Sequence, residues 1–391
     1  MTAPTDIVIT AARRTAMGGF QGDFRDVTAP ELGAAALKAA VADAKLAPAD
    51  VEQVVMGCVL PAGLGQAPAR QAALKAGLDL GAACVTLNKM CGSGMKAVMD
   101  AHDALKAGSA AIIAAGGMES MTNAPYLLPK ARGGYRMGHG RVMDHMFLDG
   151  LEDAYEPGRA MGTFAEETAR AYQFTREAQD AYALESLARS QRAIADGSFA
   201  AEITAVATKA GEVLVDEQPG KARPDKIPGL KPAFAPDGTV TAANASSISD
   251  GAAALILMRR ETAEARGLTP LATILGHSVH AQKPALFTTA PVPAMQKLMG
   301  KLGWSVEGTD LFEVNEAFAV VTMVAMQELG IPHAKVNVNG GATALGHPIG
   351  ASGARILVTL IHALQKRGGG RGVASLCIGG GEATAVALHV Q

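Results

Sequence analysis

Cys91 is the residue of this chain whose position most directly suggests chemistry. It stands in "LNKMCGSGMKAVM" (87–99), directly before a glycine–serine–glycine turn and a run whose apolar spacing predicts a helix. Unpaired N–H groups and the positive dipole end of a helix start stabilise a thiolate, so the placement predicts a nucleophile with a lowered pKa. The alternative is a small buried apolar residue, the common role of a free cysteine.

A thiol nucleophile needs a base, and His347 is the histidine held between glycine and proline, in "NGGATALGHPIGASGAR" (339–355). Cys377 ends an apolar run and precedes three glycines, which let backbone N–H groups approach a ligand oxygen. Asn315, in "FEVNEAFA", ends another predicted strand, where its amide could hold a water or a carbonyl oxygen. Taken alone, His347 and Asn315 also fit structural roles, as a packed side chain and a turn residue.

The elements that must position these residues are written twice. The stretch 91–117 reads as glycine corner, helix, turn, apolar strand and glycine pair, and 349–381 repeats that order. Two similar helix-to-strand stretches, 28–57 and 289–316, precede the copies at nearly the same offset. We infer an internal duplication of an α/β half-domain, whose equivalent corners face a common centre. His347 lies just upstream of the second corner.

The sequence between the copies differs in kind. It holds a basic stretch (129–145), a predicted helix (177–197) and a segment (219–234) too rich in proline for regular structure. The predicted organisation is therefore a first half at 1–117 plus 247–268, a loop domain at 118–246, and a second half at 269–391.

Five side chains of the helix after Cys91 fall on one face, and we interpret that face as core packing. The two methionines fill space there, and the histidine is interpreted as a hydrogen-bonded member of the face instead of a ligand. These residues are Met95, Val98, Met99, His102 and Leu105.

Composition excludes several classes of protein. The 391 residues are 49% hydrophobic and 18% charged with a formal net charge of −2, which excludes disorder and gives no global attraction to nucleic acid or an anionic membrane. Four cysteines without a Cys-x-x-Cys pair do not suggest a disulfide scaffold. No run approaches the ~20 apolar residues of a spanning helix. These features predict a cytoplasmic protein without nucleic-acid or membrane partners.

Two other functions remain open at this point. "GSGMKA" fits the glycine pattern of a dinucleotide fold, which would make the protein an oxidoreductase, but the pattern expects an acidic residue about 20 positions later. Here the next strand runs into Glu119, 27 residues after Gly92. A binding protein with unreactive thiols is the other alternative.

Six segments together resemble the thiolase family, most closely its acetyl-CoA acetyltransferases: "NKMCGSGMKA", "AGGMESMTNAPYLL", "NASSISDGAAAL", "NEAFA", "NVNGGATALGHPIGASGARIL" and "LCIGGGEA". The resemblance covers nearly the whole chain and opposes the oxidoreductase interpretation. It implies the thiolase fold, an α/β protein of duplicated βαβαβαββ halves in a layered α-β-α-β-α core with an inserted loop domain. The implied reaction is the reversible Claisen condensation of two acetyl-CoA to acetoacetyl-CoA and CoA. A degradative 3-ketoacyl-CoA thiolase of broader chain length is the alternative.

The resemblance also implies a role for each candidate residue. Cys91 would take the acyl group as a thioester in a ping-pong reaction, and His347 would draw its proton. Cys377 would move the α-proton of the second acetyl-CoA. Asn315 would hold a water of one oxyanion hole, to which His347 also contributes, and the N–H groups of Cys91 and Gly379 would form the other. CoA thioesters are substrates here, and neither a metal nor any other cofactor is implied.

Coenzyme A is a polyanion and requires a local basic patch. One cluster is Lys130, Arg132, Arg136 and Arg141, and another is Lys221, Arg223 and Lys226. In similar enzymes the inserted segment covers CoA and joins dimers into tetramers, which implies a homotetramer. The substrate-lining positions implied by the resemblance are Met161, Phe234, Ala242, Ser246, Ile248, Phe287 and Phe318.

Several positions depart from the family pattern. Ala160 stands where short-chain relatives commonly have a histidine beside the acyl-CoA, and Phe287 stands where they have a methionine. Ser247 replaces a glycine, and Ser249 replaces an asparagine. One wall of the pocket therefore loses bulk while another gains a ring, so these departures leave the preferred acyl length open.

Overall fold

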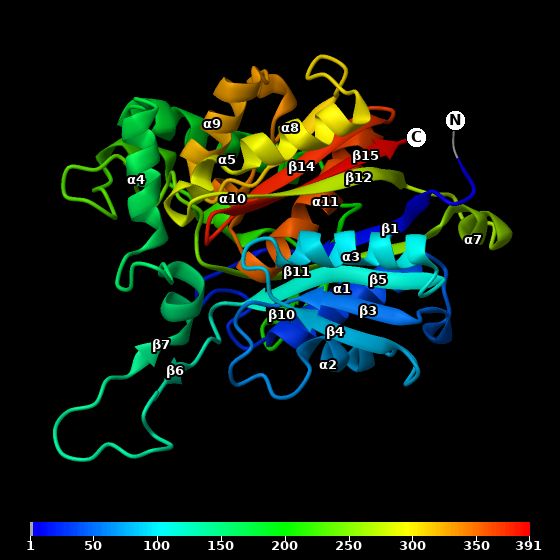
Figure 1. The fold of residues 1–391 in the computed structure, drawn as a ribbon, viewed down its shortest axis with the longest axis horizontal. Helices are drawn as coiled ribbons and strands as arrows, with labels where there is room; N and C mark the ends of the chain where they lie inside the picture. Colours follow the sequence, from blue (N-terminus) through cyan, green and yellow to red (C-terminus); the bar gives the residue numbers. More distant parts are fainter. Residues whose placement is uncertain (1–2) are drawn as a thin grey trace.

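Two half-sheets join through one strand from each, β1 and β12, in the computed structural model, which describes residues 3–391 (Figure 1). The first half consists of β1 (Ile7–Thr15), β2 (Gly18–Gly19), α1 (Ala29–Asp43), β3 (Gln53–Gly57), α2 (Pro68–Lys75), β4 (Ala83–Leu87), α3 (Ser93–Ala107), β5 (Ile112–Ser120) and β11 (Ser249–Arg259). The second half consists of β12 (Ala272–Ala281), α8 (Pro291–Leu302), β13 (Leu311–Val314), α9 (Ala319–Leu329), α10 (Ala342–Leu345), α11 (Ile349–Lys366), β14 (Gly370–Ile378) and β15 (Glu382–Val390).

The two halves repeat one pattern of strand pairing. In the first half the order is β4-β3-β5-β11-β1, with β3, β4 and β5 parallel and β11 antiparallel to both neighbours. In the second half the order is β13-β14-β15-β12, with β13 and β14 parallel and β15 antiparallel to both neighbours. The repeated pairing confirms the duplication inferred from the sequence.

The second half departs from the predicted βαβαβαββ order at one strand. The counterpart of β4 is reduced to a single parallel bridge between Phe312 and Val336. Asn337, with φ of 46°, turns the chain directly afterwards. Its side-chain amide accepts from the Val314 N–H at 2.9 Å and donates to the Val314 carbonyl at 2.8 Å. One side chain thus supplies the two hydrogen bonds that a further strand would have made with this residue.

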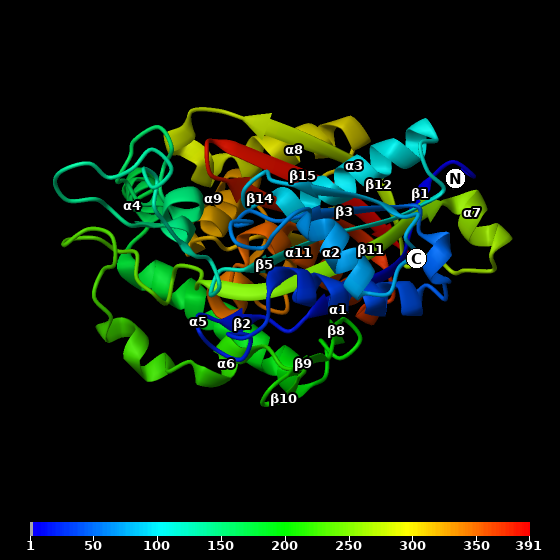
Figure 2. The ribbon, with the colours of Figure 1, turned by 90° about the horizontal axis from the view of Figure 1, so that it is seen from below.

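Helices and half-sheets alternate in five layers (Figures 1 and 2). α3 and α11 lie between the half-sheets, α1 and α2 cover the outer face of the first, and α8 and α9 cover the outer face of the second. This arrangement is the predicted α-β-α-β-α core. α11 is buried along most of its length, as a helix between two sheets must be. Within residues 3–391, no helix combines the length and apolar character needed to cross a membrane.

The two central helices touch at their glycine corners. A Cβ added at Gly94 of α3 would lie 2.8 Å from the Ala354 nitrogen, and one added at Gly353 of α11 would lie 2.4 Å from the Met95 nitrogen. These two contacts exchange under a single offset of 259 residues, so they are related by the internal repeat. Only glycine permits backbones to approach this closely, which explains why both corners are glycine-rich.

The inserted segment forms a cap with its own short elements. Its predicted helix is α5 (Arg176–Ala195). The segment predicted to lack regular structure instead contains a short helix, α6 (Glu217–Lys221), and a 3₁₀ helix, η3 (Pro224–Gly229). Prolines are tolerated in both, because each is too short to need many backbone donors. The other elements in and around the cap are β6 (Tyr126–Leu127), β7 (Met143–Asp144), α4 (Met161–Ala171), β8 (Ile203–Thr204), β9 (Val206–Thr208), β10 (Gly211–Val213) and α7 (Arg260–Ala265).

Candidate active site

A fixed turn presents Cys91 at the start of α3. Met90 adopts a positive φ of 48°, which a non-glycine residue seldom does without support. Its N–H donates to Asn88 Oδ1 at 2.9 Å, and its carbonyl accepts from Ser93 Oγ at 2.6 Å. Ser93 Oγ also accepts from the Lys89 N–H at 2.8 Å. Three hydrogen bonds therefore hold the turn that carries the thiol.

The thiol of Cys91 does not have the lowered pKa predicted from its place at a helix start. Burial raises its pKa to about 11, and the charge of Glu119 raises it further, although the N–H groups of Gly379 and of Cys91 itself act in the opposite direction. The prediction was wrong because desolvation of the thiolate outweighs the helix end. The resting group is a neutral thiol whose sulfur lies within reach of the Gly379 N–H.

His347 is a neutral, buried imidazole. Burial lowers its pKa to about 3, and the nearby cation of Arg355 contributes to the same shift. Nδ1 lies 2.5 Å from Ser352 Oγ, which in turn donates to the Pro348 carbonyl at 3.1 Å. With that hydroxyl proton directed to the carbonyl, Ser352 Oγ accepts from the imidazole, and we assign the imidazole proton to Nδ1 on this ground. Nε2 is then the basic nitrogen, and within residues 3–391 it is buried without a hydrogen-bond partner.

Asn315 follows β13 and lies beside His347. Its Nδ2 is 3.5 Å from His347 Nδ1, and its Oδ1 is 3.5 Å from Nη2 of Arg355. Arg355 is buried and lies 3.7 Å from Glu313, whose pKa burial raises to about 8. The guanidinium holds Oδ1, the amide atom that can accept from it, so Nδ2 lies on the imidazole side. There it contacts the protonated Nδ1 without a hydrogen bond between them.

Cys377 and Gly379 lie where β14 ends, against the Cys91 turn. Cys377 is fully buried, and burial raises its pKa well above the ordinary range, with a further rise from Cys91. Ile378, between them, is close enough to the α3 start that a Cβ on Gly92 would lie 2.4 Å from it. The structure thus brings Cys91, Cys377 and Gly379 together. His347 lies two residues before Ile349, and Cys91 packs against the apolar cluster that contains Ile349.

Glu119 is a site residue that sequence reasoning did not assign to this chemistry. It is fully buried at the end of β5 and accepts the N–H groups of Val59, Leu60 and Gly350 at 2.9, 3.1 and 2.8 Å. Burial raises the pKa of its carboxyl to about 7, against the lowering by those donors. A charged residue at the end of the apolar run "AIIAAGGMES" was the available signal. Ser352 and Arg355 were missed for the same reason: both are polar residues inside an apolar helix.

A basic cleft leads toward His347. Its volume is about 310 Å³, and its lining joins exposed cations of the cap to the backbone beside the imidazole, since the His347 N–H donates to the Ser247 carbonyl at 3.2 Å. Ser246, next along, donates its N–H to the Ala317 carbonyl. Of the predicted CoA-binding residues, the cleft is lined by Lys221, Arg223 and Ala242, together with Lys226 and Ser247.

The predicted apolar substrate residues gather around the two thiols. Phe287, Phe318 and Cys377 belong to one buried cluster, against which Met161 and Phe234 pack. Phe234 stands edge-on to Phe318 with ring centroids 6.0 Å apart. Ile248 packs on the same cluster as Cys91.

Three residues singled out from the sequence lie beside other cavities. Met161 and Gly379 line a cavity of about 530 Å³ that also contacts Met90, next to Cys91. Ala160 lines an open pocket with Phe234.

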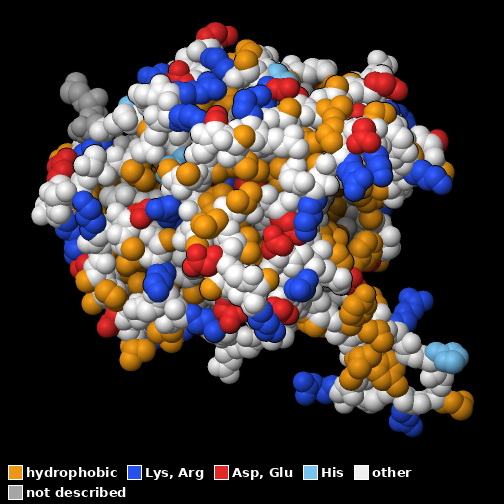
Figure 3. Space-filling view, turned by 180° about the vertical axis from the view of Figure 1, so that it is seen from behind, with side chains coloured by type: hydrophobic (Ala, Val, Ile, Leu, Met, Phe, Trp, Pro, Cys, Tyr) orange, Lys and Arg blue, Asp and Glu red, His pale blue; other side chains and the backbone are white. Residues whose placement is uncertain are grey.

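The other basic cluster is not part of this centre. Lys130, Arg136 and Arg141 line a separate cavity in the loop between β6 and β7. That loop projects from the body of the molecule in Figures 1 and 3. Of the two clusters proposed to meet CoA, only the Lys221 cluster opens toward the candidate catalytic residues.

Comparison with known proteins matches both halves of the chain. The thiolase amino-terminal domain matches residues 7–261 and the thiolase carboxy-terminal domain matches residues 268–390. The acetyl-CoA acetyltransferase of Escherichia coli is 50% identical, with 98% of each chain covered, and that of Pseudomonas aeruginosa is 49% identical, with 98% of this chain and 99% of the relative covered. Among solved structures, the Acat5 thiolase from Ascaris suum in complex with coenzyme A aligns with a TM-score of 0.95 at 41% identity, covering 99% of this chain and all of that one.

Proposed function

Because the chain belongs to the thiolase family, we propose that it is an acetyl-CoA acetyltransferase that joins two acetyl-CoA into acetoacetyl-CoA and CoA, reversibly, through an acyl-enzyme on Cys91. The observation that carries the proposal is the meeting of the Cys91 sulfur with the Gly379 N–H and the Cys377 thiol. A nucleophile, a donor for the carbonyl oxygen and a second acid–base group are what thioester condensation requires.

In the first half-reaction, His347 Nε2 takes the proton of the Cys91 thiol as the sulfur attacks the thioester carbonyl. Both groups start neutral, because burial raises the pKa of Cys91 to about 11 and lowers that of His347 to about 3. Proton transfer therefore accompanies attack instead of preceding it. The developing oxyanion is received by the N–H groups of Cys91 and Gly379. A donor of this kind is worth about 3 kcal/mol, or roughly a hundredfold in rate.

Cys377 serves the departing CoA and the second substrate. Its thiol gives a proton to the leaving CoA thiolate, which leaves the Cys377 sulfur as the base. That sulfur then removes the α-proton of the second acetyl-CoA, and the resulting carbanion attacks the Cys91 thioester. Cys91 leaves as a thiolate and takes back the proton held by His347. The enolate oxygen faces His347 and a water held by Asn315. CoA thioesters are the only small molecules that this sequence of steps uses.

The cap supplies the remaining parts of the proposal. Lys221 and Arg223 would bind the CoA phosphates at the mouth of the basic cleft, and its small lining residues would admit the pantetheine arm. β6 and the loop after it carry exposed apolar side chains, including Tyr126, Met137 and Val142. Figure 3 shows hydrophobic side chains gathered on the projecting segment. Contact between such loops would join dimers into a homotetramer. The proposed location is the cytoplasm.

The proposal is tested by thiolysis of 3-ketoacyl-CoA substrates of increasing length, with mass spectrometry of the acylated peptide. Acetoacetyl-CoA should be the preferred substrate, and the acetyl group should be found on the peptide that contains Cys91. A preference for long chains would support the broader thiolase instead. Acylation confined to another peptide would contradict the mechanism.

A further inference from the structure

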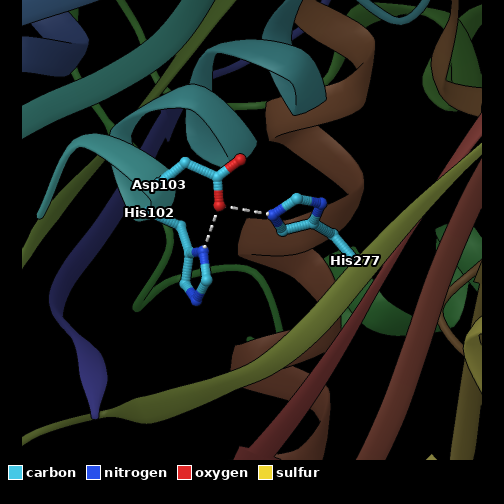
Figure 4. Close-up of side chains that lie close together, drawn as sticks. All are labelled: His102, Asp103 and His277. Atoms are coloured by element: carbon cyan, nitrogen blue, oxygen red, sulfur yellow. Dashed lines mark hydrogen bonds and ion pairs between the residues drawn. The ribbon is translucent and has the colours of Figure 1, made fainter. Parts of the chain in front are cut away.

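Two histidines and an aspartate from different halves of the molecule converge on one point (Figure 4). His102 Nδ1 and His277 Nε2 each lie 2.9 Å from the same oxygen, Oδ1 of Asp103. The rings meet edge to face with centroids 5.1 Å apart. Within residues 3–391, these residues form the group of three His, Cys, Asp or Glu side chains whose possible metal-ligand atoms all lie within 4.8 Å of one another.

The three donor atoms are better suited to binding a transition-metal ion than to hydrogen bonding among themselves. Two imidazole nitrogens and a carboxylate are a common set for Zn²⁺ and its first-row neighbours, which bind such atoms at about 2.0–2.2 Å. In this structure each imidazole nitrogen lies at hydrogen-bond distance from the single shared oxygen. The donors need only to close inward, and the Asp103 side chain is 58% exposed.

The elements that carry these residues hold two of the three ligands firmly. His102 lies on the buried side of α3, with 12% of its side chain exposed, and His277 has 21% exposed. On β12, the next residue, Ser278, points the other way and donates to the Ala294 carbonyl of α8 at 2.7 Å. His277 is therefore directed to the opposite face, toward α3. An exposed third ligand leaves room for a water as the fourth.

The cluster is separate from the proposed catalytic centre. His102 lies eleven residues after Cys91, which along a helix corresponds to about 17 Å. An ion there cannot act on the thioester. It would instead connect α3 of the first half to β12 of the second half, near the short join between the half-sheets.

We propose that His102, Asp103 and His277 bind one divalent first-row transition-metal ion, of the Zn²⁺ class, with water completing a tetrahedron. The bound ion links the two halves and stabilises the folded chain, since a ligand that binds only the folded state adds to its stability. His102 makes a hydrogen bond with Asp103, as its sequence-based interpretation expects. Under the proposal, the same side chain would also bind the ion.

The test is titration of the metal-free, full-length protein with Co²⁺, followed by visible absorption and by the melting temperature. We expect one equivalent bound with the weak absorption of nitrogen and oxygen ligands, and without the strong near-ultraviolet band of a thiolate–cobalt bond. His277→Gln and Asp103→Asn should each weaken binding at least about tenfold and remove the rise in melting temperature. Asp103→Asn is an isosteric change at an exposed position, so it tests the site even if His277→Gln folds poorly.

His280→Gln is the matched control. His280 lies on the same strand but bonds Gln282 and Lys297, so its loss should leave Co²⁺ binding unchanged. Two results would overturn the proposal: a wild-type protein that binds no Co²⁺ at this site, or variants of His277 and Asp103 that bind it as tightly as wild type. Thiolate absorption alone would place the ion at a cysteine and would equally reject this site.

Discussion

Glu119, at the end of β5, lies against Gly350 at the start of α11, and Ile378, at the equivalent end of β14, lies against Gly92 at the start of α3. The carboxylate accepts the Gly350 N–H, so the start of α11 is occupied by a structural hydrogen bond. Isoleucine offers no acceptor to the start of α3. The duplicated corner thus fills one helix start with protein; under the proposed function, the other, next to Cys91, would receive a substrate oxygen.

The serines of the two corners show the same division. Under the 259-residue offset, Ser93 corresponds to Ser352, and each donates its hydroxyl to a carbonyl of the turn before it. Ser93 Oγ then accepts a backbone N–H, that of Lys89, whereas Ser352 Oγ accepts from the imidazole of His347. One scaffold of hydrogen bonds therefore fixes a thiol turn in the first half and a base in the second. Substitutions can test whether the two corners have separate roles.

Cys91→Ala should have the largest effect. Without the sulfur the first corner holds no nucleophile, and turnover should fall by at least about 10⁴-fold. Mass spectrometry after incubation with acetyl-CoA should find no stable acetyl-peptide. Normal turnover by this variant would remove the first corner from the mechanism.

Cys377→Ala should separate the two half-reactions. Acylation of Cys91 should persist at a reduced rate, because the leaving thiolate loses its proton donor, while condensation should fall by about 10³-fold because the α-proton has no base. Rapid-quench measurement of the acetyl-enzyme and a condensation assay provide the two rates. Equal loss of both would contradict the division of roles between the thiols.

His347→Ala should reduce turnover by about 10²–10⁴-fold, as loss of a general base does. Ser352→Ala should cost about tenfold in kcat with little change in KM, because it releases the tautomer that leaves Nε2 basic. In a protein that already carries His347→Ala, adding Ser352→Ala should no longer reduce kcat. Ser93→Ala acts on the turn that carries Cys91, so it should change kcat by the same factor with and without His347→Ala. The three steady-state comparisons measure whether the equivalent serines serve different groups.

The sequence was sufficient for the repeat and for the residues at its corners, because both are recorded in local patterns. Cys91 precedes a helix and Cys377 ends a strand, and a duplicated order of elements predicts that such points meet. The pKa of Cys91 could not be read in the same way, since it depends on how many groups from distant segments exclude water. Val336 shows the same limit. The βαβαβαββ order implied by the resemblance calls for a further strand in this part of the second half, but Val336 forms a single bridge because the side chain of Asn337 makes the hydrogen bonds of that strand.

Glu119→Gln tests the filled corner directly. Its folded pKa of about 7 lies above the ordinary 4.5, so the folded state keeps a proton that the unfolded chain loses between those values. The free energy of unfolding of the wild type should therefore fall as pH rises from about 4.5 to 7, by up to about 3 kcal/mol from this group. The variant should lack that slope and be less stable by about 1–3 kcal/mol at pH 5, because its amide cannot accept all three N–H groups.

Denaturant unfolding at pH 5 and pH 8 measures both differences. Removal of the charge should also lower the pKa of Cys91 and shift its iodoacetamide reaction to lower pH, with the buried Cys58 as an internal reference. An unchanged pH profile of alkylation would mean that the Glu119 carboxylate does not influence the pKa of Cys91.

Substitutions in the basic cleft should have the smallest effects. They test whether CoA reaches the site through this cleft, beside His347. Lys221 pairs with Glu217, whereas Arg223 is absent from the ion pairs formed within residues 3–391. Arg223→Ala should therefore raise the KM for acetyl-CoA about three- to tenfold, more than Lys221→Ala does, with kcat nearly unchanged because a phosphate contact is the same in ground and transition states. The Arg223 effect should shrink at high salt. Arg136→Ala, in the separate cluster of the projecting loop, is the matched control, and a larger rise in KM there would assign CoA to the other basic surface.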